Sequence, residues 1–157
     1  MNEKLLSLKA ALAAASTALC AFLGWKGVMA LVWVALMAID YISGTLAARH
    51  SGEWKSSIAR EGLWHKGGMI LVVTVSAIAD FILMVVFENM PMLNFEWPGI
   101  VLPLVLAWYI ITELGSILEN AIKFGADVPD WLLKILNASL GAVDTAGDAL
   151  SDEKEVK

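Results

Sequence analysis

The chain has 157 residues, 59% of them hydrophobic, and its mean hydropathy is +0.70. A soluble domain of this size has too little interior to hide so much apolar surface, so the composition predicts an integral membrane protein. The net charge is −5, with acidic residues gathered toward the C-terminal end, which argues against nucleic acid as a partner. The single cysteine, Cys20, excludes an internal disulfide.

The first apolar segment covers residues 8–25 and is uncharged between Lys9 and Lys26. At about 1.5 Å per residue, this uncharged part is roughly 24 Å long, slightly less than the ~30 Å hydrocarbon core of a bilayer. The segment therefore predicts either a short membrane-spanning helix or a helix lying in the interface. The chain as a whole is expected to have four spans, or three in the second case.

The second and third apolar segments, residues 28–48 and 67–87, have the length of spanning helices. The polar stretch that joins them carries four basic residues, Arg49, Lys55, Arg60 and Lys66, whereas residues 88–96 carry two acids and neither Lys nor Arg. Because short basic loops stay in the cytoplasm, we expect the first connection to be a cytoplasmic basic loop and the second to be external. The C-terminus is then cytoplasmic.

The fourth apolar segment covers residues 97–122. Pro98 suits the start of a helix, and Pro103 is expected to remove an internal hydrogen bond and bend the helix. Residues 1–126 thus form the predicted transmembrane domain. Apolar residues recur at helical spacing in residues 127–150, which predicts an amphipathic C-terminal helix, and residues 151–157 form a charged tail. The fold class is an all-α membrane bundle with an added amphipathic helix.

Each of the last three spans carries a carboxylate, namely Asp40, Asp80 and Glu113. A carboxylate at the centre of a span costs roughly 2.5–3.5 kcal/mol on insertion scales, which a nearby cation reduces. Asp40 and Glu113 fall in the cytoplasmic half, where either can pair with Lys66 or Arg49. Asp80 falls in the outer half without an evident cation, so we expect it to be protonated or in contact with water.

Other polar or small residues share helical faces with these carboxylates. Such faces either hold the bundle together through hydrogen bonds or line water when several copies assemble, and the sequence leaves both interpretations open. The candidate positions within the spans are Asp40, Ser43, Gly44, Asp80, Glu113, Ser116, Glu119 and Asn120.

The sequence shows no pattern of an enzyme. It contains no HExxH motif, no Gly-rich phosphate loop and no Ser/His/Asp set with a credible base. Two histidines without a cysteine pair make a metal site improbable. We therefore predict neither catalysis nor a cofactor.

Four blocks of the chain, in order, resemble the toxin-secretion/phage-lysis holin family. Residues 40–48, DYISGTLAA, are similar to its D-Y-x-[ST]-G-x-x-A-A stretch, and Ser56-Ser57 with residues 62–66, GLWHK, are similar to the run before its next span. Asp80 lies where the family has an aspartate. Residues 113–120, ELGSILEN, followed by Gly125 and Val128-Pro129, are similar to the family's ending. The resemblance covers about residues 24–136.

This resemblance implies a phage or prophage holin in the bacterial inner membrane. Such a protein forms homo-oligomers in the lipid bilayer, and the resulting lesions release an endolysin or a toxin and set the time of host lysis. Direct contact with the released protein is not implied. Two alternatives stay open: a small proton-coupled transporter or channel, and a structural membrane subunit. A transporter would be expected to show inverted repeats, and the sequence shows no repeat between its halves.

Overall fold

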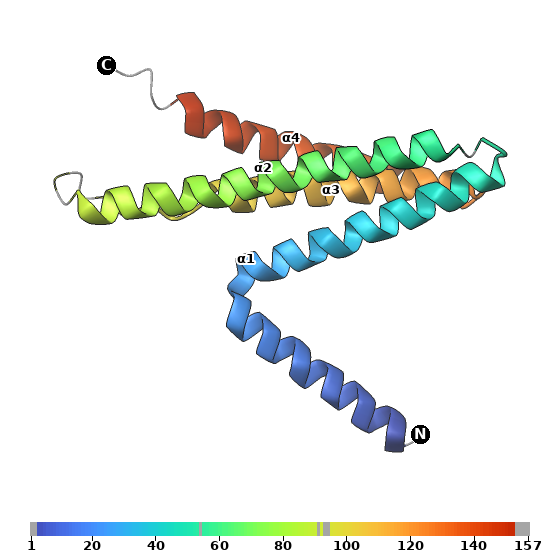
Figure 1. Ribbon diagram of the computed structural model, residues 1–157, viewed down its shortest axis with the longest axis horizontal. Helices are drawn as coiled ribbons and strands as arrows, with labels where there is room; N and C mark the ends of the chain where they lie inside the picture. The colour runs from blue at the N-terminus through green and yellow to red at the C-terminus, as the bar shows by residue number, and fades with distance from the viewer. Residues whose placement is uncertain (1–2, 54, 91, 93–94, 153–157) are drawn as a thin grey trace.

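The computed structural model describes residues 3–152 except 54, 91, 93 and 94. Within residues 3–23, it describes the side chains only at positions 14, 17 and 21. The side chains at positions 58, 59, 151 and 152 are also outside the description. The described part contains four helices and no strand: α1 Glu3–His50, α2 Ser56–Asn89, α3 Val101–Lys123 and α4 Asp130–Asp152. Helix α3 is central, because it packs against each of the other three (Figure 1). The predicted all-α class is confirmed.

Three helical stretches among the described residues are long and apolar enough to cross a membrane: Gly24–His50, Arg60–Asn89 and Val101–Lys123. They correspond to the predicted spans 28–48, 67–87 and 97–122. The first predicted span, residues 8–25, is helical and forms the N-terminal arm of α1. Its crossing of the membrane stays a prediction, because most of its side chains lie outside the described ones.

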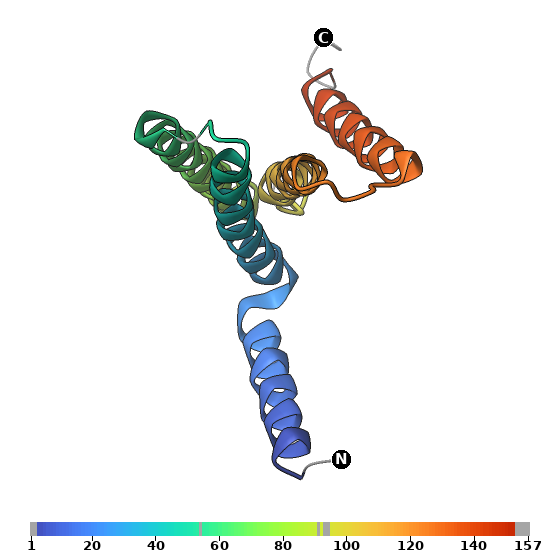
Figure 2. The ribbon, with the colours of Figure 1, turned by 90° about the vertical axis from the view of Figure 1, so that its right-hand side faces the viewer.

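The arm of α1 turns away from the other helices at Gly24 (Figures 1 and 2). The backbone of Gly24 has φ 65° and ψ 179°, a region that is essentially restricted to glycine. The helical hydrogen-bond ladder cannot continue through this conformation. The sequence therefore fixes the place of the kink at its only glycine between residues 1 and 26.

The predicted basic loop is wrong in its extent. Helix α2 begins at Ser56, so only residues 51–55 join α1 to α2. Residues 56–66 contain no proline and mostly fair helix formers, and the helix simply extends beyond the apolar segment. Arg60 and Lys66 consequently belong to α2 rather than to a loop, and Arg49 belongs to the last turn of α1.

The predicted start of the fourth helix is also corrected. Helix α3 starts at Val101 rather than at residues 97–98, because Gly99 adopts a positive φ of 66° and interrupts any helix there. Pro103 is the third residue of α3. The first amides of a helix have no partner within it, so Pro103 removes no internal hydrogen bond and the expected cause of a bend is absent.

The apolar core of the described residues is small. Trp33 and Met37 of α1, Met69 of α2 and Leu106 of α3 are buried together, and Trp33 stacks on Tyr109 with ring centroids 6.0 Å apart. Many other large apolar side chains point outward. On α2 these include Leu71, Val75, Ile78 and Phe81. A bundle that is apolar outside and partly polar inside matches a lipid environment.

The predicted amphipathic helix is present as α4. It follows the turn after α3, where Gly125 has φ 84°, and runs back along α3 in the opposite direction (Figure 1). Trp108 Nε1 of α3 donates a hydrogen bond of 2.9 Å to Asp144 Oδ1 of α4.

Candidate functional site

A polar cluster joins α1, α2 and α3 near the end of the bundle where α1 meets α2. Lys66 Nζ lies 3.0 Å from Asp40 Oδ2 and 2.8 Å from both carboxylate oxygens of Glu113. The side chains of Lys66 and Glu113 are only 13% and 4% exposed. Lys66, one of the two cations that the sequence offered as partners, pairs with both carboxylates.

Asn120 extends this cluster toward the end of α3. Its Nδ2 donates to Asp40 Oδ1 at 3.1 Å and to Ser43 Oγ at 3.0 Å. Asn120 also lies against Gly44, where a Cβ atom would be 3.4 Å from Asn120 Nδ2, an ordinary van der Waals contact. Asp40, Ser43, Lys66, Glu113 and Asn120 are referred to below as the Lys66 cluster.

All four carboxylate oxygens of the Lys66 cluster have partners. The cluster therefore meets the requirement that charges within a membrane be paired and hydrogen-bonded. Replacing a buried pair by apolar residues is often neutral, whereas removing one partner costs several kcal/mol. The cluster contributes chiefly to specificity, because it fixes which faces of the three helices meet.

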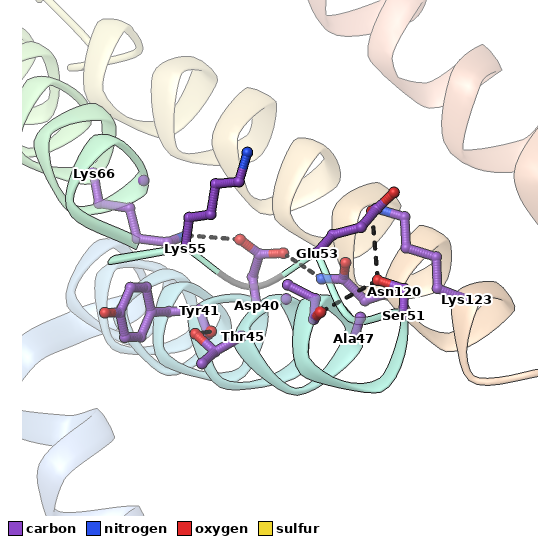
Figure 3. Close-up of a pocket in the computed structure, with 13 residues that line it drawn as sticks. Asp40, Tyr41, Thr45, Ala47, Ser51, Glu53, Lys55, Lys66, Asn120 and Lys123 are labelled. Atoms are coloured by element: carbon purple, nitrogen blue, oxygen red, sulfur yellow. Dashed lines mark hydrogen bonds and ion pairs between the residues drawn. The ribbon is translucent and has the colours of Figure 1, made fainter. Parts of the chain in front are cut away.

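The Lys66 cluster borders a cavity of about 340 Å³ at this end of the bundle. Figure 3 shows Asp40 between Lys66 and Asn120, with Ser51 and Glu53 of the α1–α2 loop at the edge of the cavity. Lys55 and Lys123 also line it. The cavity is enough for a few waters or a small headgroup, and far too small for a protein to pass.

A second cluster lies at the opposite end of α3 and is centred on Asp80 of α2. The Asp80 side chain is buried and accepts three hydrogen bonds: from Trp97 Nε1 at 2.9 Å, from the Val101 amide at 3.1 Å and from the Leu102 amide at 3.0 Å. All three partners are N–H donors, and the two carboxylate oxygens of Asp80 act as the acceptors. Asp80 is therefore largely shielded from water within one copy, and its protonation stays a prediction.

Asp80 thus serves as the cap of α3, although it belongs to another helix. The residue at the N-cap position, Ile100, has no side-chain acceptor, and no side chain of its own segment caps α3. The first amides of a helix need partners, and the positive end of the helix dipole favours a negative charge. The sequence offers no Ser, Thr, Asp or Asn directly before α3. This missing cap is the signal that could have indicated an acceptor for the first amides of α3 on another helix.

Lys26 completes the second cluster. Its Nζ donates to the carbonyl oxygen of Gly99 at 2.6 Å, which ties α1 to the turn before α3. Lys26, Asp80, Trp97 and Gly99, with the amides of Val101 and Leu102, are referred to below as the Asp80 cluster. The sequence placed Lys26 at the end of a span, as the one basic residue at the edge of the outer half, but a bond to a backbone carbonyl leaves no sequence pattern.

The remaining candidate residues lie outside both clusters. Ser116 is half-buried, and Glu119 is exposed on α3. Lys55 is the N-cap residue of α2 and Arg60 is exposed near its start. Among the described residues no group of three or more His, Cys, Asp or Glu side chains could hold a metal ion. The geometry defines a membrane protein whose polar residues mostly organise helices.

Comparison with known proteins identifies the class. The profile of the bacteriophage holin family matches residues 17–139, so the chain belongs to that family. The match includes the three span-capable stretches and the first part of α4. The resemblance stated from the four sequence blocks is confirmed. The family forms membrane lesions and is not an enzyme family.

Individual relatives are similar over much of the chain. The uncharacterized protein BH0965 of Halalkalibacterium halodurans is 27% identical over 139 residues, covering 88% of this chain and 96% of its own length. The uncharacterized protein Lmo0128 of Listeria monocytogenes is 30% identical over 105 residues, covering 67% of this chain and 66% of its own length. The uncharacterized protein CPE0383 of Clostridium perfringens is 30% identical over 98 residues, or 62% of this chain and 64% of its own length. No solved structure matches the chain.

Proposed function

We propose that this protein is a phage or prophage holin that accumulates in the bacterial inner membrane and assembles with copies of itself into lesions. The lesions release an endolysin, or a toxin, and so set the time of host lysis. The observation that carries the proposal is the family match over residues 17–139. The three span-capable helices with an apolar outer surface support the membrane location.

The packing of a single copy supports assembly. Trp33, Met37, Met69 and Leu106 fill the interior between α1, α2 and α3, and the cavity beside the Lys66 cluster measures only about 340 Å³. A folded enzyme cannot cross such a bundle. A hole of protein size therefore has to form between copies, with the Lys66 and Asp80 clusters holding each copy together.

The charge distribution supports one orientation. Arg49, Lys55 and Arg60 gather where α1 meets α2, whereas residues 88–96, which lead toward α3, carry neither Lys nor Arg. The positive-inside rule favours the α1–α2 loop and the end of α3 in the cytoplasm. The C-terminus is cytoplasmic as well when α4 lies at that surface.

The proposal is tested by inducing this chain in bacteria together with an endolysin that lacks an export signal. We expect the culture to lyse only when both proteins are present, after a delay that shortens as the chain accumulates. Endolysin alone should leave the culture intact. Chain alone should abolish the membrane potential and viability without rapid loss of optical density.

Two results would point to the alternatives. Loss of membrane potential without release of the endolysin would favour a transporter or small channel. Normal growth and an intact potential, at an accumulation confirmed by immunoblot of the membrane fraction, would favour a structural subunit.

A further inference from the structure

Helix α4 runs antiparallel to α3, and one hydrogen bond shows which residues of α4 lie beside which residues of α3. The bond from Trp108 to Asp144 sets the register between the two helices. Trp108 lies 15 positions before Lys123, the last residue of α3, which corresponds to roughly 22 Å along the helix. Because α3 is one of the span-capable helices, Asp144 lies at a depth that belongs to the hydrocarbon layer.

Helix α4 packs an apolar face against α3 and exposes polar residues, together with Trp131 and Ile135, on its other sides. Leu132, Leu133, Leu136, Leu140 and Val143 are half-buried, and among the described elements α4 packs against α3 alone. The opposite side carries residues that are polar and exposed, namely Asp130, Lys134, Asn137, Thr145 and Asp148. Unlike the other helices, α4 contains no stretch apolar enough to count as a span.

Lipid cannot solvate this polar face. A charged side chain at the centre of a bilayer costs at least ~2.5–3.5 kcal/mol, and α4 places several polar residues in the same layer as α3. Figure 2 shows α4 on the far side of α3 from the arm of α1, with no other helix against its outer face. As long as α4 lies along α3 in a membrane, its outer face needs water.

The two buried polar residues of α3 do not offer an alternative wall. Glu113 and Asn120 are buried, and their polar groups are bonded to Lys66, Asp40 and Ser43. Exposing them would break the Lys66 cluster. The polar face of α4 is already exposed while its apolar face is packed.

We propose that α4 is the helix that lines the aqueous path of the assembled lesion, with the face of Lys134, Asn137 and Thr145 toward water and its leucines on α3. This inference rests on the proposed function, because it requires that a lesion forms. It also implies that the described end of α4 lies at the level of the start of α3. The C-terminal end of α4 is then at the outer side in the lesion.

The experiment uses the full chain with Cys20→Ser, purified and reconstituted in vesicles of phosphatidylethanolamine and phosphatidylglycerol that enclose a fluorescent folded protein. Release of that protein reports the lesion. A first sample carries spin labels at Val101→Cys and Ala149→Cys, for a distance measurement by pulsed electron paramagnetic resonance. Single labels at Thr145→Cys, Leu140→Cys and Val75→Cys report collision with a water-soluble nickel chelate and with oxygen.

In vesicles that have released their contents, we expect a short distance between the labels at positions 101 and 149, because α3 and α4 lie side by side. If α4 instead lies on the membrane surface, the labels are about 35 Å apart, the length of α3. The ratio of nickel to oxygen collisions should be several-fold higher at position 145 than at position 75, which faces lipid on α2, and low at position 140, which faces α3.

Each of the other results overturns the inference. Distant labels place α4 at the surface, and close labels without nickel access at position 145 place its polar face against protein. Both results leave the proposed function intact, because release has occurred. If the Cys20→Ser protein and the unchanged chain both fail to release the enclosed protein, the proposed function fails instead, and with it the basis of this inference.

Discussion

At the scale of single residues, Lys66 connects three helices through its side chain. Its ammonium group is the partner of carboxylates from two other helices, Asp40 on α1 and Glu113 on α3. The sequence allowed this pairing to be predicted, because all three residues lie at similar depth once the spans are oriented. It did not show that Lys66 reaches both carboxylates, because this depends on α2 starting before Lys66 and carrying it into the bundle.

Replacing Lys66 by methionine should destabilise the bundle strongly. The substitution keeps the length of the side chain but leaves two carboxylates facing each other without a cation, a loss of about 3–5 kcal/mol for a broken buried pair. We expect a clearly lower melting temperature in detergent, measured by circular dichroism. The triple variant Lys66→Met, Asp40→Asn, Glu113→Gln should recover much of this loss; failure to recover would show that packing rather than charge is responsible.

Gly99 is a second residue with a specific requirement. Its φ is 66°, and a Cβ atom there would overlap Lys26 Nζ. Gly99→Ala should therefore cost about 1–3 kcal/mol and reduce the amount of folded protein that detergent extracts from membranes. Gly115→Ala is the matched control, because Gly115 is helical and a Cβ atom there meets nothing within 4 Å. Equal losses in the two variants would contradict this explanation.

At the scale of helices, the positions of the spans were predictable from apolar length, and their ends were not. Pro98 suggested a helix start that the positive φ of Gly99 prevents, and Pro103 suggested a bend although it lies in the first turn. Both errors arise because the start of α3 is determined by contacts with α1 and α2. The acceptor for its first amides, Asp80, is about 20 positions earlier in the sequence.

Removing the cap should loosen the start of α3 locally. Asp80→Asn keeps one acceptor oxygen and loses the charge, so we expect a cost of about 1–2 kcal/mol by analogy with helix caps; Asp80→Leu should cost more. Hydrogen exchange followed by mass spectrometry should show faster exchange in peptides that contain Val101 and Leu102. Exchange in the core of α2 should change little; uniform acceleration would mean that the whole bundle had loosened.

At the scale of the whole molecule, the described bundle is apolar outside. Val75 lies near the middle of the candidate span Arg60–Asn89 and is 65% exposed. Composition alone predicted this surface. The directions in which most of its residues point came from the structure, because the span of α2 is largely apolar and only Ser76 and Asp80 mark its inward face.

Placing a charge on this surface should impair insertion. Val75→Asp adds roughly 2.5–3.5 kcal/mol at the centre of the span, and we expect a several-fold fall in the membrane-inserted fraction, measured by carbonate extraction. Val75→Thr, of similar size and uncharged, is the control and should insert nearly as well as the unchanged chain. If the aspartate variant inserted equally well, position 75 would have to contact water or protein rather than lipid.

The two polar clusters hold α2 against α3 at two separate heights. Lys66 and Asp80 are 14 positions apart on α2, and they bind Glu113 and the start of α3 respectively. A slip of α3 by one helical turn, about 5.4 Å, would break both sets of bonds at once, and a rotation would do the same. The two sets of bonds therefore favour one alignment of the two helices, with the apolar contacts of Met69 and Leu106 between them.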